Sequence, residues 1–490
     1  MTLEDSLRRV CAASAGEARA LPFAAYTDPD LHARERERIF AREWIALGSA
    51  AALSEPGDTL TVTLGNEPVI VVRGEDGELR ALSNVCRHRG TPLLDEGIGH
   101  ASSLVCPYHA WGYGLDGRLK GVPHPGDVVV DKAAHALPSY RVETWAGVVF
   151  VNLDPQAPPL AERVAGIDAR LSRYALDRFT HPTRISLHAW DANWKLAVEN
   201  GIESYHLFRV HPETLEPYTP TRGAFYLEGS AEATLTAGTT KLARAAHPGD
   251  SEGLGAWERE HYVLVSLPPS FVGILTADSW GWISVLPSGP EQCTVLGAGL
   301  SPVATEEGAG SEFFEAFLAE DQAICERNQR GMRSAQEGGQ LVELERVVVD
   351  FHQYLGNRLF GTPTDPPFSV ERDSAEPDAS PPQATPKTAA SAPASVDVAP
   401  KRRSLAKPWS IATLCVLVAT TLAGWSWPWG LLFLFWTLRS LRDGITQLVE
   451  PVARAENPAL FWSINAVWAL GSMALIAFDL WRWLGPAGPV

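Results

Sequence analysis

The sequence predicts an α+β chain in which a small all-β domain, an α+β domain and an apolar helical C-terminal segment follow one another. Three observations lead to this expectation. Short strand patterns separated by turn signals fill residues 45–155, mixed helical and strand patterns fill residues 156–361, and two uncharged apolar runs lie beyond residue 407. A chain of 490 residues is long enough for two or three domains.

The boundaries of these parts follow changes in composition. Residues 1–44 are expected to add N-terminal helices to the α+β domain, which continues over 156–361 after the β domain of residues 45–155. Residues 362–407 contain nine prolines among alanine, serine and acidic residues, a composition that cannot bury enough apolar surface to fold. They are therefore expected to form a disordered linker, followed by the apolar segment at 408–483.

Charge and cysteine usage limit the function. The net charge of −17 argues against a nucleic-acid partner, because a phosphate backbone would be repelled. The first ten residues include acidic side chains and lack an apolar core, so no signal peptide is expected. Four cysteines without regular spacing are expected to be free thiols in a reducing compartment: Cys11, Cys293, Cys325 and Cys415.

The β domain is predicted from alternation and turn signals. Leu60–Leu64 alternates between apolar and polar residues, and Pro68–Val72 is a short apolar run. Gly74–Gly77 supplies the turn that follows, and Val148–Leu153 closes the region with a last strand signal. We expect a small sheet that carries two ligand loops at one end.

Two cysteine–histidine pairs stand in this domain. Cys86 and His88 form the first pair, and Cys106 and His109 form the second after 17 intervening residues. Two thiolates and two imidazoles in this order can hold a [2Fe–2S] cluster with both cysteines on one iron and both histidines on the other. Tetrahedral zinc is the alternative, but a zinc finger groups its ligands as Cys-Cys and His-His. The ligand order favours the cluster.

A second group of candidate ligands follows in the α+β domain. His206 and His211 are five residues apart, and such a pair converges only at a helix end or in a widened turn. Two imidazoles and one carboxylate make the facial triad of non-haem Fe(II), which leaves positions for O₂ and substrate. The carboxylate is expected later, on the amphipathic helix predicted at Glu315–Arg330, which carries Glu320 and Asp321. Ordinary histidines and a solvated acidic face are the alternatives.

The motifs resemble those of a known family. CRHRG at 86–90 and CPYHAW at 106–111 resemble the Rieske motifs of the ring-hydroxylating non-haem iron oxygenases. Cytochrome bc-type Rieske proteins carry an extra cysteine beside each motif, and this chain has none there. The acid and two histidines of segment 203–211 resemble the mononuclear iron motif of the same oxygenases. The resemblance covers about residues 20–361.

This resemblance implies a fold and a set of site residues. The catalytic domain is expected to be an α+β domain of helix-grip type. Glu203 takes the place of an acid that bridges two subunits; many members have Asp there, and Glu occurs in members similar to carnitine-type oxygenases. The implied ligands are Cys86, His88, Cys106 and His109 for the [2Fe–2S] cluster, and His206, His211 and Asp321, with Glu320 as the alternative to Asp321, for mononuclear Fe(II).

The implied function is that of a terminal oxygenase. Such a protein uses O₂ and external electrons to hydroxylate or oxidatively demethylate a small organic substrate. The sequence has no Gly-rich dinucleotide fingerprint and no four-cysteine ferredoxin set, so a separate NAD(P)H-dependent reductase or ferredoxin is the expected donor. The family further implies a homotrimer in which the cluster of one subunit serves the iron of its neighbour. A membrane-tethered Rieske electron carrier without oxygenase activity is the alternative.

The C-terminal segment predicts a membrane anchor. Residues 408–438 and 457–478 carry no charge, and nine of the 17 tryptophans lie in the tail, several of them at the ends of these runs. Thirty-one residues would make about 46 Å of helix, too long for one straight span of about 30 Å. A break at 425–430 therefore predicts a hairpin, with a further span near 458–481.

This arrangement has three spans, with two as the alternative. The hairpin would place the basic residues at 401–403, together with Arg439 and Arg442, on the cytoplasmic side of the cytoplasmic membrane. The catalytic part would then face the cytoplasm. An apolar dimerisation tail is the other interpretation, although so large an apolar surface would tend to aggregate.

Overall fold

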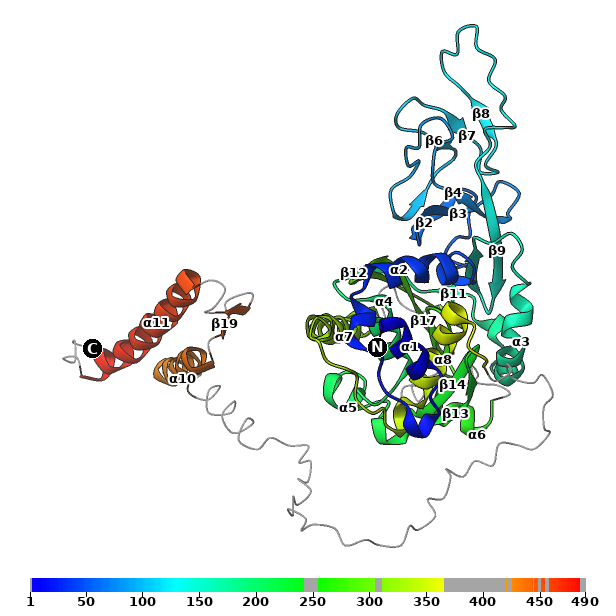
Figure 1. Cartoon of the computed structure of the whole chain (residues 1–490). Coiled ribbons are helices and arrows are strands. Elements are labelled where there is room, and N and C mark those ends of the chain that lie inside the picture. Colours follow the sequence, from blue (N-terminus) through cyan, green and yellow to red (C-terminus); the bar gives the residue numbers. More distant parts are fainter. Residues whose placement is uncertain are drawn as a thin grey trace, which may run out of the picture. The chain divides into compact units, whose positions relative to one another are not determined.

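The computed structural model describes residues 2–241, 254–304, 311–364, 420, 425–443, 445–447, 451–453 and 458–484. The chain divides into two compact units, Met1–Pro382 and Gln383–Val490 (Figure 1), each of which is described by itself. Most of the predicted linker lies outside the described residues, as do all but one of residues 408–424.

The N-terminal segment belongs to the larger unit. Helix α1 (Leu3–Cys11) is capped by Thr2, whose hydroxyl accepts the backbone N–H of Asp5, and it packs against the late helix α8 (Arg346–Phe360). Helix α2 (Pro29–Glu35) has a proline at its first position. Shorter turns occupy Ala15–Glu17, Phe23–Tyr26 and Arg36–Phe40.

A seven-stranded antiparallel sheet forms the β domain. Its strands in spatial order are β1 (Ile45–Ser49), β10 (Val148–Asn152), β9 (Ser139–Trp145), β4 (Leu79–Ser83), β3 (Glu67–Arg73), β2 (Asp58–Leu64) and β5 (Gly97–His100). The predicted strands at Leu60–Leu64, Pro68–Val72 and Val148–Leu153 coincide with β2, β3 and β10. A small sheet of β6 (Leu104–Val105), β7 (Gly112–Tyr113) and β8 (Leu119–Gly121) extends the domain away from the rest of the unit (Figure 1).

The α+β domain is built on an eight-stranded antiparallel sheet. Its strands in order are β11 (His181–Pro182), β18 (Gln292–Ser301), β17 (Trp280–Gly289), β16 (Phe271–Leu275), β15 (His261–Leu267), β14 (Ala233–Thr239) and β13 (Ala224–Ser230), with β12 (Ser186–Trp190) also paired to β18. Helix α4 (Trp194–Ile202) contacts β15 to β18, and α7 (Ser311–Met332) and α8 flank it. The remaining helices are α3 (Leu160–Leu171), α5 (Leu207–Val210) and α6 (Ala256–Glu260).

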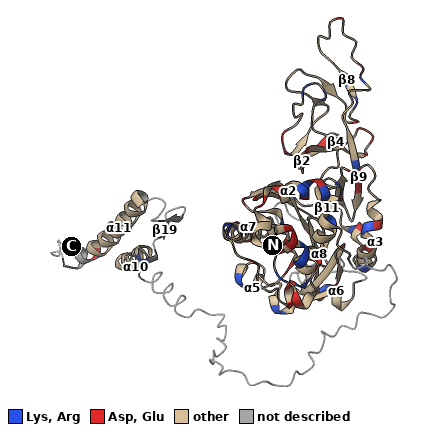
Figure 2. Ribbon diagram, viewed as in Figure 1, with Lys and Arg blue, Asp and Glu red and all other residues tan. Residues whose placement is uncertain are grey.

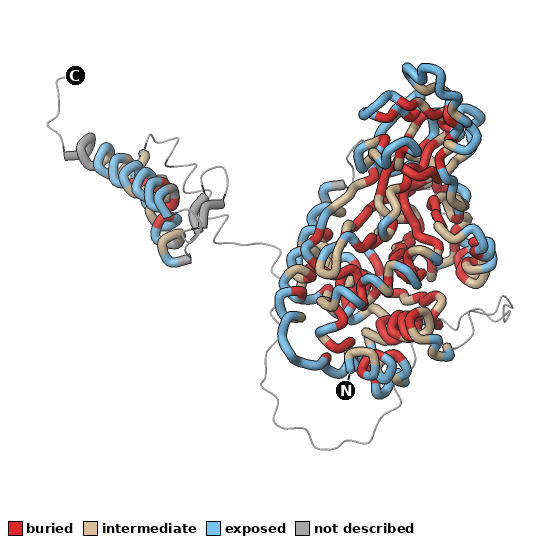
Figure 3. Tube along the Cα trace, turned by 45° about the horizontal axis from the view of Figure 1, so that its top comes forward, coloured by how far each residue is buried: buried red, intermediate tan, exposed pale blue. Residues whose placement is uncertain are grey.

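The two sheets share one apolar core. The indole N–H of Trp282 on β17 donates to the carbonyl of Leu47 on β1 at 3.0 Å, and that of Trp280 donates to Ala146 at 3.1 Å. Buried residues run through both domains (Figure 3), and the same core cluster includes strands of each. The predicted α+β class, with an all-β domain joined to an α+β domain, is confirmed.

His32 on α2 is expected to make folding sensitive to acid. Burial, with the charges of Arg36 and Lys195, lowers the pKa of His32 from 6.5 to about 4. Since the unfolded chain takes up this proton first, the contribution to stability is complete above pH 6.5 and is lost as the pH falls toward 4. We expect a loss of about 2–3 kcal/mol in the free energy of unfolding.

Urea denaturation at neutral pH and near the lower end of this range measures that loss. His32→Gln removes the titrating ring and leaves the carboxylates unchanged, so it is the matched control. An equal acid-induced loss in the two proteins would contradict the assignment to His32.

The smaller unit contains a helical hairpin. Helix α10 (Trp427–Asp443) lies against α11 (Pro458–Leu484), and the short strands β19 (Ile445–Gln447) and β20 (Pro451–Ala453) lie between them in sequence. Asp479 accepts the backbone N–H groups of Ser426 and Trp427 and so caps α10 from α11. Gly430 allows close approach, because a Cβ there would lie 2.7 Å from the carbonyl oxygen of Ser472.

Few charges occur on these two helices (Figure 2). Among the described residues, Phe461–Asp479 is the one helical stretch long and apolar enough to cross a membrane, which alone is weak evidence for a membrane location. Helix α10 begins at the predicted break. The number of spans remains a prediction, because the first predicted arm lies almost wholly outside the described residues.

Candidate metal centres

The two cysteine–histidine loops have the same backbone design. In the first loop the N–H of Gly90 donates to the carbonyl of Cys86, and in the second the N–H of Ala110 donates to that of Cys106, both at 3.0 Å. Gly90 and Ala110 close these turns with φ of 78° and 54°. Left-handed backbone is ordinary for glycine and costs energy for alanine, so the second loop is held by its surroundings.

These loops bring the four predicted cluster ligands to one end of the β domain. Cys86 and Cys106 are both 2 % exposed, and the rings of His88 and His109 lie 4.9 Å apart. Trp111 stacks on His88 with the planes 6° apart. Burial would raise the pKa of the Cys106 thiol, but the N–H groups of the turn outweigh burial and lower it. The loops therefore hold two buried cysteine sulfurs and two neighbouring imidazoles at the same end of the domain.

Tyr113 on β7 adds a hydrogen bond that the motif spacing did not predict. Its buried hydroxyl accepts the backbone N–H of Arg87 at 3.0 Å and lies 3.4 Å from Sγ of Cys86. With Cys86 as a deprotonated cluster ligand, as predicted, the Tyr113 hydroxyl would donate to the sulfur. Hydrogen bonds to cluster sulfurs stabilise the reduced, more negative state and raise the reduction potential.

Tyr113→Phe is expected to lower the midpoint potential of the cluster by roughly 40 mV. This figure follows from a hydrogen bond of about 1 kcal/mol in a one-electron couple. Redox titration followed by EPR measures it. Tyr108→Phe is the matched control, because the Tyr108 hydroxyl is exposed and contacts Arg89. Equal shifts in both variants would contradict the assignment.

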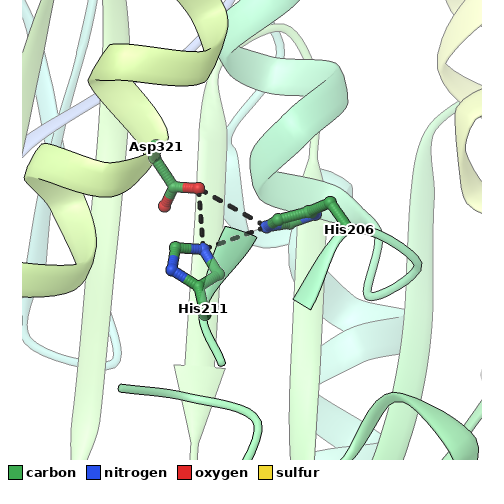
Figure 4. Close-up of side chains that lie close together, drawn as sticks. All are labelled: His206, His211 and Asp321. Atoms are coloured by element: carbon green, nitrogen blue, oxygen red, sulfur yellow. Dashed lines mark hydrogen bonds and ion pairs between the residues drawn. The ribbon is translucent and has the colours of Figure 1, made fainter. Parts of the chain in front are cut away.

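His206 and His211 flank a single helical turn. Helix α5 covers only Leu207–Val210, with His206 just before it and His211 just after it. Because the turn ends at once, the two rings converge, and their Nε2 atoms lie 3.2 Å apart (Figure 4). The expected helix end is therefore present between the two histidines.

Asp321 on α7 completes the group. Its Oδ1 lies 2.9 Å from Nε2 of His211 and 3.4 Å from Nε2 of His206, as drawn in Figure 4. Two donor atoms at right angles, each about 2.1 Å from one ion, are about 3.0 Å apart, so the three separations fit donors around a single metal. Two imidazoles and one carboxylate are the donor set of facial non-haem iron sites.

Glu320, the alternative third ligand, faces the other side of His211. Its Oε2 lies 2.7 Å from Nδ1 of His211 and accepts the hydroxyl of Thr214 at 2.5 Å. Asp321 in turn accepts the side-chain N–H of Asn200 at 2.7 Å. A carboxylate on the remote nitrogen fixes the orientation of a metal-binding histidine. This geometry gives the metal-facing position to Asp321 and a supporting position to Glu320.

Glu203 supports His206 in the same way. Its Oε1 lies 2.6 Å from Nδ1 of His206, and its Oε2 accepts the backbone N–H groups of Tyr205 and, at 3.2 Å, of His206. Glu203 is thus the residue that ends α4 and turns its carboxylate back onto the next segment.

The charges of the group are mutually stabilising. Burial would lower the pKa of His206, but hydrogen bonds with Asp321 and Glu203 outweigh it and raise the pKa to about 10. Burial would raise the pKa of Asp321, and its bonds to His206 and His211 instead lower it to about 2. The site favours a positive charge between the carboxylates, which a metal ion supplies when it replaces the proton.

Two family models match the chain. The Rieske [2Fe-2S] domain matches residues 43–141, and the catalytic domain of the ring hydroxylating alpha subunit matches residues 176–360. The chain joins the two domains that define the Rieske oxygenases. By this composition it carries a [2Fe–2S] cluster and a mononuclear non-haem iron. When bound, these groups supply one-electron transfer and O₂ activation.

Curated relatives come from the same family. The oxygenase subunit of glycine betaine monooxygenase from Chromohalobacter salexigens is 39% identical over 196 residues, which are 40% of this chain and 44% of the relative. The oxygenase subunit of carnitine monooxygenase from Escherichia coli is 36% identical over 206 residues, 40% of this chain and 53% of the relative. The matched part thus spans about half the length of these relatives.

Solved structures cover more of the chain. A quaternary ammonium Rieske monooxygenase, studied for carnitine oxidation by gut microbiota and for inter-subunit electron transfer, superposes with a TM-score of 0.62 at 25% identity, over 72% of this chain and 98% of that one. Naphthalene 1,2-dioxygenase from Rhodococcus sp. shares the fold, with a TM-score of 0.60 at 21% identity over 74% of this chain and 98% of that one.

Proposed function

We propose that the chain is the terminal oxygenase component of a Rieske system. The observation that carries this proposal is the convergence of His206, His211 and Asp321 within a chain that also has two cysteine–histidine pairs. A Rieske electron carrier without oxygenase activity has no use for such a triad, so the triad favours the oxygenase. We assign Cys86, His88, Cys106 and His109 to the cluster, and His206, His211 and Asp321 to the iron.

The chain's residues prepare these sites in defined ways. Glu203 and Glu320 each accept from the remote Nδ1 of a histidine, so both Nε2 atoms are left to face Asp321. The side-chain N–H of Asn200 donates to Oδ1 of Asp321, the same oxygen that faces the two histidines. Electrons would come from a separate NAD(P)H-dependent reductase or ferredoxin. In the homotrimer implied by the family, Glu203 would also accept a hydrogen bond from His109 of the partner subunit.

The substrate class we propose is a methylated ammonium compound. Phe317 lies one helical turn before Asp321 on α7, and Phe313 lies one turn before Phe317, so these rings share the face that carries the site. The ring centroids of His211 and Phe317 lie 6.3 Å apart, and those of Phe317 and Phe313 lie 5.7 Å apart. The centroids of Phe313 and Tyr218 are separated by 5.8 Å. Aromatic faces near carboxylates attract quaternary ammonium groups.

Relatives that act on glycine betaine and carnitine support this class. The proposed reaction hydroxylates an N-methyl group. One C–H bond is replaced by C–OH, the second oxygen atom of O₂ leaves as water, and two electrons and two protons are consumed. The resulting carbinolammonium then loses its hydroxyl proton as its C–N bond breaks, and it releases formaldehyde and the dimethylamino product.

A pair of isosteres tests the proposal. Glycine betaine and 3,3-dimethylbutanoate have the same shape, but only the first carries a cationic nitrogen. With a surrogate ferredoxin and reductase, we expect O₂ uptake matched by formaldehyde with the betaine and little uptake with 3,3-dimethylbutanoate, which lacks the cationic nitrogen. Equal use of both would overturn the substrate class. If protein loaded with both iron centres consumes no O₂ with any compound, the proposed oxygenase function is wrong.

We also propose that the tail anchors the enzyme to the cytoplasmic membrane, with the catalytic unit in the cytoplasm. Exposed apolar side chains on both α10 and α11, such as Phe435 and Leu470, support this role. Truncation after Gly361 is expected to give a protein that stays in the soluble fraction with both iron centres, because the family-like region ends there. Ultracentrifugation of lysates and iron analysis measure this, and loss of iron on truncation would contradict it.

A further inference from the structure

A small cavity lies beside Glu203, on the side of the large sheet. Its volume is about 10 Å³, and its lining residues are Glu203, Ser204, Ala224, Phe225, Tyr226, Thr236 and Leu344. A space of this size accommodates about one water molecule, provided that polar groups surround it. Four of the lining side chains carry oxygen, so the cavity meets that condition.

Thr236 is the lining residue whose hydrogen bonding is incomplete. It stands on β14, and its Oγ1 is buried and has no hydrogen-bond partner among the described residues. A buried hydroxyl that has given up water without a replacement partner is unfavourable, and such groups in native proteins are usually bonded to ordered water. The orphaned hydroxyl therefore points to a bound water.

The other polar walls can complete the coordination of that water. Within the chain Glu203 accepts from Nδ1 of His206 and from two backbone N–H groups, so in the proposed trimer the water would share the remaining acceptor position with His109 of the partner subunit. The Tyr226 hydroxyl donates to Asp350 at 2.9 Å beside Gly229, so Tyr226 forms a wall of the cavity while its hydroxyl is engaged elsewhere. The Ser204 hydroxyl is engaged with Tyr262 at 3.1 Å.

We propose that this cavity binds one ordered water, which accepts from the Thr236 hydroxyl and donates to the Glu203 carboxylate. Thr236 is then a positioning residue. Through the water it holds the carboxylate in the rotamer that meets Nδ1 of His206. The role of Glu203 between two metal centres rests on the proposed function, whereas the water site itself does not.

Thr236 is thereby expected to affect electron transfer, although it is far in sequence from every proposed metal ligand. Without the water, the Glu203 carboxylate keeps its backbone contacts but loses the bond that resists rotation away from His206. Electron transfer through a hydrogen-bonded carboxylate depends on that contact. Metal content and cluster potential should not depend on it.

Three variants of the full-length protein test the site. Thr236→Val removes the hydroxyl and keeps the shape, Thr236→Ser keeps the hydroxyl, and Thr239→Val changes an exposed threonine of the same strand outside the cavity. High-resolution crystallography of these proteins should show the water in the wild type and in Thr236→Ser and not in Thr236→Val. Single-turnover reoxidation of the reduced cluster should slow about tenfold in Thr236→Val alone. Glu203→Gln is expected to give the slowest reoxidation of the cluster among these variants.

Two results would overturn the proposal. One is a wild-type crystal structure in which the cavity is empty or filled by a side chain of another subunit. The other is a rate of cluster reoxidation in Thr236→Val that equals the wild-type rate, in protein with full iron content and an unchanged cluster potential. If the wild-type protein itself transfers no electron to its iron, the proposed function fails, and the crystallographic comparison still decides the water site.

Discussion

His206→Ala is expected to remove one iron per chain and to abolish O₂-dependent turnover, while the Rieske cluster stays reducible. The Nε2 atom of His206 is one corner of the group formed with His211 and Asp321, and two remaining donors bind a metal far more weakly than three. Asp321→Ala should behave in the same way. Iron and acid-labile sulfide analysis, with EPR of the reduced cluster, separates loss of the mononuclear iron from loss of the protein fold.

Glu320→Gln is the matched comparison for Asp321→Ala. Glu320 is the adjacent residue and contacts His211 through Nδ1, on the side away from Asp321. Loss of such outer support usually costs 10–100-fold in metal affinity, so iron should be retained at saturating iron and lost on dialysis. If Glu320→Gln cannot be loaded while Asp321→Ala keeps its iron, the two roles are reversed.

The histidine pair shows what spacing alone can predict. A separation of five residues does not fit one helical face, and from this the sequence predicts a helix end between His206 and His211. The structure has a four-residue helix there. The prediction succeeded because it depends only on local backbone geometry.

The identity of the third ligand cannot be predicted from sequence spacing. Glu320 and Asp321 are consecutive on α7, and neighbouring side chains on a helix point about 100° apart. Either could face the histidines until the rotation of α7 about its axis is known, and that rotation is set by packing against α4. Only the three-dimensional fold separates the two carboxylates.

The supporting residues were not predicted because they come from distant segments. Tyr113 reaches Cys86 from β7, and Thr236 reaches the Glu203 cavity from β14. Neither residue belongs to a motif, and a tyrosine or threonine in a strand is ordinary for its β-propensity. Their positions depend on strand register, which the sequence pattern does not fix over such separations.

A buried ion pair behind the iron site has the largest expected effect on stability. Nζ of Lys195 on α4 lies 2.7 Å from Oε1 of Glu35 on α2, and both side chains are 1% exposed. The indole N–H of Trp194 donates to the other Glu35 oxygen at 2.8 Å. The pair joins the N-terminal segment to the helix that ends at Glu203.

Lys195→Met is therefore expected to lower the free energy of unfolding by about 3–5 kcal/mol, because it leaves the Glu35 carboxylate buried without a counter-charge. The double variant Glu35→Gln/Lys195→Met removes both charges and keeps an acceptor for Trp194, so it should recover most of this loss. Arg333→Met breaks an exposed pair with Glu291 of the same 2.7 Å length and should cost less than about 1 kcal/mol. Urea denaturation of the three variants measures these differences. A Lys195→Met loss no larger than that of Arg333→Met would show that the buried pair does not hold α2 to α4.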